Sequence, residues 1–184
     1  MRHPLPHPLR HPRHPLLAPL VLAPLVLAGG CLDSTGPGVF EEIPVEEVPF
    51  DPSLGINLED FTPLETGIWI REDVEGAGDT VALGQQAAFH YAGWVYTGFL
   101  FDRAEEEDGP PPVILLGSIG PLGGLTQGVR GMRIGEVRTV LVPPQLGFGA
   151  VDFPGIPPNS WLVLRIRLVA IDGESEVPDA GGAE

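Results

Sequence analysis

Alternation of apolar and polar positions predicts two long strands, one near the middle of the chain and one near its end. Over residues 87–95 and again over 162–169, every second residue falls on one mainly apolar face of an extended chain. These shared-face residues are Phe89, Tyr91, Gly93 and Val95 in the first segment and Leu162, Leu164, Ile166 and Leu168 in the second. Shorter β-favouring or apolar runs at 67–71, 113–116 and 137–142 predict further strands.

One segment has a helical period instead. Apolar residues recur there after three, four and three positions, which predicts a short helix with an apolar stripe. The residues of this stripe are Leu122, Leu125, Val129 and Met132. Five or six strands with one short helix predict an α+β domain in which an antiparallel sheet wraps on the helix.

The first thirty residues have the order of a secretory signal. Three arginines precede an apolar run from Leu16 to Ala28, which is too short to span a membrane as a helix. Small residues then lead to Cys31, the single cysteine of the chain, in an order that resembles a bacterial lipobox. We therefore predict a lipoprotein signal peptide over 1–30 and lipidation of Cys31. An ordinary signal peptide with an incidental cysteine is the alternative.

The predicted lipid anchor implies a location. Several acyl chains at Cys31 would hold the chain on a membrane stably, where a single chain would exchange. Leu32, not Asp, follows the cysteine, and by the enterobacterial sorting rule such a lipoprotein goes to the outer membrane. The sequence thus predicts a cell-envelope protein, lipid-anchored at the periplasmic face of the outer membrane.

Composition divides the remaining chain into three parts. Residues 31–57 are rich in Glu, Asp, Pro and Gly with few apolar residues in phase, which predicts an extended acidic linker after the lipidated cysteine. Residues 173–184 are acidic and Gly-rich and predict a disordered tail. The segment 58–172 between them holds the apolar residues for one domain.

The charge of the chain excludes one class of partner. Ten arginines and no lysine stand against 25 acids, for a net charge of −15, and the predicted loss of 1–30 with its three arginines would make this −18. Such a surface repels phosphate backbones, so sequence-independent binding of nucleic acid is not expected.

Candidate catalytic groups are few. After the predicted signal peptide, His90 is the sole histidine and Cys31 the sole thiol. The sequence therefore offers no serine–histidine–aspartate spacing and no cluster of His and Cys for a transition metal. The acidic run 105–108 lacks the interleaved spacing of a calcium loop and predicts a solvated loop. We predict His90 as a packed strand residue, and we expect neither a cofactor nor a metal.

Rotation about an Xaa-Pro bond is a reaction that needs neither nucleophile nor metal. Its barrier of about 20 kcal/mol comes from amide resonance, which is lost in the twisted transition state. Charge separation falls as the amide twists, so an apolar cleft favours the twisted form over the planar one. Such a site consists of aromatic and aliphatic residues with almost no polar groups.

The order of motifs resembles the FKBP-type peptidyl-prolyl isomerases over about 66–171. The landmarks are His90-Tyr91-Ala92-Gly93, Gly98-Phe99-Leu100-Phe101-Asp102, Leu116-Gly117, the segment from Gly128 to Glu136, Val142-Pro143-Pro144, Phe148-Gly149 and Ile156-Pro157-Pro158-Asn159. The resemblance implies a five- to six-stranded antiparallel half-barrel sheet wrapped on one short helix, which agrees with the periodicity.

The resemblance also implies which residues form the site. They are Tyr91 as the wall, Phe101 as the aromatic beside it, Asp102 as a buried carboxylate at the rim, Leu122 as a backbone donor to a ligand carbonyl, Leu125 as the floor under the proline ring, Phe148 and Ile156 in the flap, and Leu164 at the back. The alternative is that these residues are simply core.

Four positions depart from the family pattern. Leu125 stands where the family often has Trp, and Phe148 stands where it has a Tyr whose hydroxyl binds a substrate carbonyl. Pro112 and Pro121 replace an aromatic lip residue and a Val. These departures predict a smaller, less aromatic cleft and reduced isomerase activity.

The sequence therefore predicts a peptidyl-prolyl cis-trans isomerase that assists folding of exported proteins at the cell envelope. Its partners would be proline-containing unfolded or exported polypeptides and the membrane, and it would be a monomer. The first alternative is a weakly active or inactive peptide-binding or chaperone module on a lipid anchor. A structural envelope protein with a vestigial cleft is a second.

Overall fold

The computed structural model describes residues 43–117 and 123–175. The predicted signal peptide over 1–30, the lipidation site Cys31 and the backbone donor Leu122 lie outside these described residues, as does Pro121. No helix among the described residues is long and apolar enough to cross a membrane.

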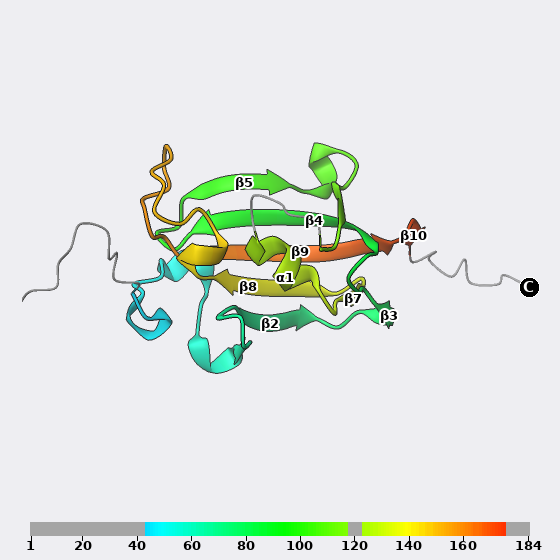
Figure 1. The fold of residues 1–184 in the computed structure, drawn as a ribbon, viewed down its shortest axis with the longest axis horizontal. Coiled ribbons are helices and arrows are strands. Elements are labelled where there is room, and N and C mark those ends of the chain that lie inside the picture. The colour runs from blue at the N-terminus through cyan, green and yellow to red at the C-terminus, as the bar shows by residue number, and fades with distance from the viewer. Residues whose placement is uncertain (1–42, 118–122, 176–184) are drawn as a thin grey trace, which may run out of the picture. The chain divides into compact units, whose positions relative to one another are not determined.

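An antiparallel sheet dominates the fold, with strand order β1-β2-β8-β9-β4-β5 (Figure 1). Its strands are β1 (Thr62–Pro63), β2 (Trp69–Val74), β8 (Val137–Val142), β9 (Leu162–Ile171), β4 (Gln86–Val95) and β5 (Leu100–Ala104). Two short strands extend it, because β6 (Val113–Leu115) pairs with β4 and β10 (Glu174–Ser175) pairs with β9. The strands β3 (Ala77–Thr80) and β7 (Arg133–Ile134) form a separate two-stranded sheet.

One short α-helix, α1 (Gly123–Val129), lies across a face of the sheet in front of β8 and β9 (Figure 1). This arrangement of an antiparallel sheet and one short helix confirms the predicted α+β fold. Five 3₁₀ helices complete the described elements: η1 (Val45–Glu47), η2 (Pro52–Leu54), η3 (Leu58–Asp60), η4 (Glu106–Asp108) and η5 (Pro144–Leu146).

Glycines let α1 approach the sheet closely. A Cβ at Gly124 would collide with Val142, and a Cβ at Gly128 would lie 2.9 Å from Cγ2 of Val140. The helical stripe predicted from the sequence is therefore only partly right. Val129 is fully buried, but the residues that face β8 most closely are glycines, and Leu125 is only half-buried.

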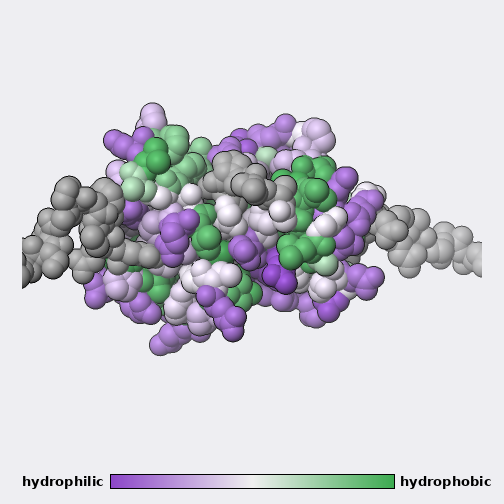
Figure 2. Space-filling model, in the orientation of Figure 1, coloured by the Kyte–Doolittle hydropathy of each residue, from purple (hydrophilic) through white to green (hydrophobic). Residues whose placement is uncertain are grey.

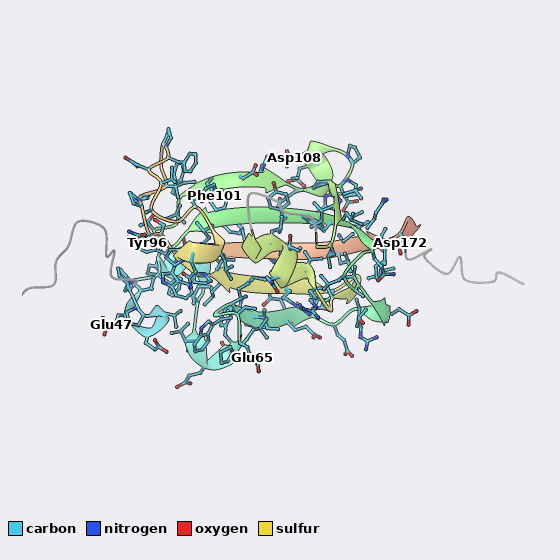
Figure 3. The ribbon with its side chains drawn as sticks, in the orientation of Figure 1. Glu47, Glu65, Tyr96, Phe101, Asp108 and Asp172 are labelled. Atoms are coloured by element: carbon cyan, nitrogen blue, oxygen red, sulfur yellow. The ribbon has the colours of Figure 1, made fainter. Side chains whose placement is uncertain are left out.

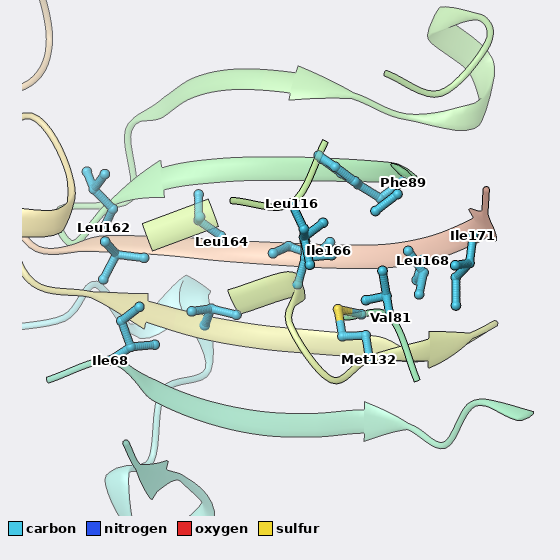
Figure 4. Packing of buried hydrophobic residues seen from close by; sticks show 14 of the residues in the cluster. Ile68, Val81, Phe89, Leu116, Met132, Leu162, Leu164, Ile166, Leu168 and Ile171 are labelled. Carbon is cyan, nitrogen blue, oxygen red and sulfur yellow. The ribbon is translucent and has the colours of Figure 1, made fainter. Parts of the chain in front are cut away.

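The main hydrophobic core lies on the face of the sheet that α1 covers, which we call the inner face (Figure 4). The predicted alternation of β9 is confirmed there, because its inward residues are almost completely inaccessible to solvent. The largest of the fully buried side chains are Phe89, Ile68, Leu116, Met132, Leu141, Leu162, Leu164, Ile166 and Leu168, all but Leu141 in this core.

A second hydrophobic cluster covers one end of the opposite, outer face of the sheet. We call residues 43–61 the strap. Its residues Val45 and Val48 share this cluster with Trp161 and with Val163 of β9. The indole N–H of Trp161 donates a hydrogen bond of 2.8 Å to the carbonyl of Ile43.

The predicted linker over 31–57 is therefore wrong from residue 43 onward. The apolar residues of the strap lie in or beside single-turn 3₁₀ helices, so they follow neither the helical nor the strand period. At the other end, Glu174 and Ser175 pair with β9, so the domain continues past the predicted boundary at residue 172. Residues 176–184 of the predicted tail lie outside the described residues.

Candidate active site

Half-buried aromatic side chains gather on the inner face, toward the end of the sheet where β4 turns into β5. Tyr91, Phe101 and Phe148 all pack against the main core, each with part of its surface exposed. The rings of Phe101 and Phe148 meet edge to face, with centroids 5.4 Å apart and planes at 88°. We call these three residues the aromatic group. Phe101 extends from β5 toward this end of the sheet (Figure 3).

Gly93 creates the space that Phe101 occupies. A Cβ at residue 93 would lie 2.6 Å from Cζ of Phe101 and 3.0 Å from Cδ2 of Leu164. Any larger residue would therefore push the Phe101 ring away from β4. This explains in physical terms why glycine stands at the end of the His90-Tyr91-Ala92-Gly93 landmark.

Tyr91 carries the one hydroxyl of the aromatic group, and Asp102 holds it. The phenol donates a hydrogen bond of 2.5 Å to Oδ2 of Asp102. Burial, the hydrogen bond to Asp102 and the charge of that carboxylate raise the pKa of Tyr91 to about 12. Tyr91 therefore remains a protonated hydrogen-bond donor across the neutral range.

The structure corrects the expected burial of Asp102. The residue is exposed, because it lies on β5 at the edge of the main sheet. Its other oxygen, Oδ1, accepts a hydrogen bond of 2.9 Å from the backbone N–H of Arg103. Asp102 is thus a solvent-facing anchor for the Tyr91 hydroxyl rather than a buried charge.

The three aliphatic residues expected in the site lie at different depths. Leu164 and Ile156 are buried, with 1% and 6% of their surface exposed, and belong to the core beneath the aromatic group. Leu125 is half-buried on α1 and packs on the same core. The described apolar site residues therefore share one hydrophobic cluster, with Asp102 at its exposed edge, whereas Leu122 lies outside the described residues.

Phe153 is a site neighbour that the sequence interpretation missed. Its ring lies 5.1 Å from that of Phe148, at 61°, so a chain of three rings runs outward from Phe101. The sequence signal that could have found it was an aromatic residue five positions after Phe148, inside the segment expected to form the flap.

Pro112, which departs from the family pattern at the lip, accepts at its carbonyl a backbone hydrogen bond of 3.2 Å from the N–H of Phe89.

The remaining polar candidates play structural roles. His90 is half-buried on β4, with its Nδ1 3.2 Å from the carbonyl of Ala104. Residues 105–108 form a mostly exposed acidic loop in which Asp108 pairs with Arg103 at 3.2 Å. Within residues 43–117 and 123–175, no group of His, Cys, Asp and Glu is arranged to hold a metal ion.

This arrangement offers ring faces and methyl groups, with a single hydroxyl–carboxylate pair at the edge. It can remove water from a bound peptide and hold a proline ring by packing. The described part of the site presents no side chain placed to attack a carbonyl.

Comparisons with known proteins point to one family. A family model described as "FKBP-type peptidyl-prolyl cis-trans isomerase" matches residues 78–169, which is half of the chain. The chain is 37% identical over 110 residues to "FK506-binding protein 4" of Mycosarcoma maydis, covering 60% of this chain and 29% of that protein. It is 34% identical over 101 residues to "Peptidyl-prolyl cis-trans isomerase Mip" of Chlamydia muridarum, covering 55% and 40%.

A solved structure agrees with this similarity. The N-terminal domain of FKBP42 from Arabidopsis thaliana superposes with a TM-score of 0.56 at 26% identity, covering 61% of this chain and 91% of that one. This chain spans less than a third of the length of the first curated relatives that it matches.

Proposed function

Because the chain belongs to the FKBP-type peptidyl-prolyl cis-trans isomerase family, we propose that it catalyses Xaa-Pro isomerisation in exported polypeptides at the cell envelope. The aromatic group would hold the proline ring, and the lipid anchor at Cys31 would keep the domain at the membrane. The chain would act as a monomer on proline-containing unfolded segments.

The proposed mechanism depends on the low polarity of the aromatic group. The planar amide carries more charge separation than the twisted one, so transfer from water to an apolar surface costs the ground state more than the transition state. Phe101 and Phe148 supply that surface, and Leu164 closes it from below. Tyr91, held by Asp102, supplies a fixed ring edge and the one hydroxyl.

The observation that carries this proposal is the seating of Phe101. Its ring fits into the space left by Gly93, rests on Leu164 and meets Phe148 edge to face. The ring is half-exposed although its surroundings are close-packed. A rigid, apolar and solvent-accessible surface of this kind suits a proline ring.

The test is a protease-coupled isomerisation assay on the full-length chain in detergent, with a proline-containing tetrapeptide. Phe101→Ala and Tyr91→Ala should each lower kcat/KM by about tenfold or more, since each removes a wall of the proposed site. Trp69→Ala, an aromatic truncation on the outer face, is the matched control and should retain turnover. Equal turnover in all four proteins would remove the aromatic group from the mechanism.

The envelope location needs its own experiment. The Cys31→Ser chain and the unaltered chain are compared for membrane association after cell fractionation. A lipid anchor predicts that the substitution moves the protein from the membrane to the soluble fraction. Equal membrane association of both proteins would contradict the anchor without affecting the proposed isomerase activity.

A peptide-binding module of little or no activity is the second candidate. The observation that favours it is Phe148, which has no hydroxyl to bind a substrate carbonyl and instead joins Phe101 and Phe153 in a continuous set of rings. Suppression of aggregation of an unfolded protein, measured beside turnover, separates the two functions. Suppression without turnover would favour the binding module.

A further inference from the structure

Three large apolar side chains remain exposed beside the aromatic group. Phe99, Val151 and Phe153 expose 48%, 54% and 42% of their surface, and we call them the rim patch. Phe99 comes from the turn between β4 and β5, and the other two come from the loop that follows η5. Figure 2 shows hydrophobic residues gathered over this end of the domain.

The two segments of the rim patch pack on each other. Gly155 lies so close to the ring of Phe99 that a Cβ there would collide with it. Backbone hydrogen bonds in both directions between Phe153 and Ile156 close the tight turn that contains this glycine. The backbone φ of +83° at Gly155 also favours glycine. The rim patch is thus a built surface with a defined shape.

The rim patch is continuous with the proposed proline site. The Phe153 ring lies 5.1 Å from Phe148, which in turn lies 5.4 Å from Phe101. A proline ring on the aromatic group would leave the rim patch uncovered, and a short peptide would cover little of it. A longer apolar segment could extend from one to the other.

We propose that the rim patch docks apolar side chains of an unfolded polypeptide whose proline occupies the aromatic group. This inference rests on the proposed function and names its substrate class: long, unfolded, apolar segments are bound more tightly than short proline peptides. Asp152 and Asp102 are both exposed near this path, so acidic segments are disfavoured.

The experiment measures kcat/KM on two substrates: a proline tetrapeptide, and an unfolded protein whose refolding is limited by proline isomerisation. The variants are Phe99→Ser, Val151→Ser and their double mutant in the full-length chain. Large apolar side chains that dock at the centre of an interface are among the few whose truncation weakens binding strongly. The double variant should therefore lower the ratio of protein to tetrapeptide kcat/KM by roughly tenfold.

The matched control uses apolar residues that are equally exposed elsewhere. Leu83 and Val113 each expose 57% of their surface and lie outside the rim patch. The Leu83→Ser, Val113→Ser double variant should keep the ratio within about twofold, well below the tenfold change expected at the rim patch. Equal changes in the rim and control variants would overturn the proposal. Loss of a dimer in the rim variant would also overturn it, because the patch would then join copies of this chain.

Failure of the proposed function would give a different result. An unaltered chain with no turnover on either substrate would contradict the isomerase activity alone. The rim patch is then tested by fluorescence anisotropy with a permanently unfolded, labelled protein. Roughly tenfold weaker binding by the rim variant would support the docking surface. Equal affinity of rim variant, control variant and unaltered chain would exclude it.

Discussion

The two faces of the sheet are covered by different elements and to different extents. On the outer face, the strap buries Trp161 and Val163 in a second hydrophobic cluster. On the inner face, α1 covers β8 and β9, while Phe101 and Phe148 beside it stay half-exposed. The strap thus closes one end of the outer face, while Arg165 and Arg167 stay exposed farther along β9. The inner face is covered by α1 and keeps partly exposed aromatic rings beside it.

Glycines allow close packing of side chains and of α1 on the inner face. Gly93 admits the Phe101 ring, and Gly124 lets α1 sit close to Val142. Both faces carry polar contacts. Beside α1 on the inner face, Arg138 pairs with Glu136 at 2.6 Å and donates a hydrogen bond of 3.0 Å to the carbonyl of Gly128. The outer face has a second group of polar contacts. Arg71 pairs with Asp73 at 2.7 Å, and Thr139 donates a hydrogen bond of 2.5 Å to the same carboxylate. We expect substitutions on the two faces to act differently on stability and on turnover.

The largest effect on stability is expected on the outer face. Trp161→Ala removes a residue that is 96% buried and anchors the strap through Ile43, so the free energy of unfolding should fall by about 3–5 kcal/mol. Denaturant unfolding measures the loss, and the tetrapeptide assay measures turnover per folded molecule, which should persist. Lost turnover at full folding would show that the two faces are coupled.

Next in size is a substitution under α1 on the inner face. Gly124→Ala forces a methyl group into Val142, which should cost about 1–3 kcal/mol and displace the helix. Turnover should fall roughly tenfold or more, since Leu125 moves with the helix. Gly123→Ala is the matched control, because its Cβ would lie 3.6 Å from Leu146, an ordinary contact. Similar results for both alanine variants would show that close helix packing does not position the site.

A gain of activity is expected at Phe148. The half-exposed ring can accept a hydroxyl, and Phe148→Tyr would add the donor that the family pattern has at this position. One hydrogen bond worth about 1 kcal/mol corresponds to an increase in kcat/KM of roughly fivefold. Steady-state kinetics would detect it. Unaltered kcat/KM would show that the missing hydroxyl does not limit this chain.

The smallest effect concerns the ionisation of Tyr91. Its pKa of about 12 in the folded chain lies above the ordinary value of 10.0, so its contribution to stability is complete below pH 10 and is lost as the pH rises toward 12. Asp102→Asn removes the charge and should shift the phenolate titration to lower pH. Phenolate absorbance follows this, and Tyr96→Phe assigns the signal, because the chain has two tyrosines. Superimposable titrations would rule out the Tyr91–Asp102 contact.

Much of the sheet could be predicted because burial leaves a period in the sequence. The segment 137–142 coincides with β8, and the alternation of 162–168 matches the inward residues of β9. The strap could not be predicted, because 3₁₀ turns place Val45 and Val48 against Trp161 without any regular period.

The candidate site was predictable in its members more than in its geometry. The order of motifs identified Tyr91, Phe101 and Leu164, which the structure brings onto one core. Glycine carries no hydrophobic signal, so the roles of Gly93 and Gly124 appear only in three dimensions. Asp102 is likewise exposed because β5 is an edge strand, and the order of motifs does not indicate which strand lies at the edge.

The most direct test compares Phe101→Leu with Phe101→Asn in the tetrapeptide assay on the full-length chain. If an apolar surface speeds the rotation, the Leu variant should keep most of its kcat/KM, and the Asn variant should fall at least about tenfold further. Circular dichroism verifies that both variants are folded. Equal losses in the two folded variants would contradict the account, because ring shape and not low polarity would then govern the rate.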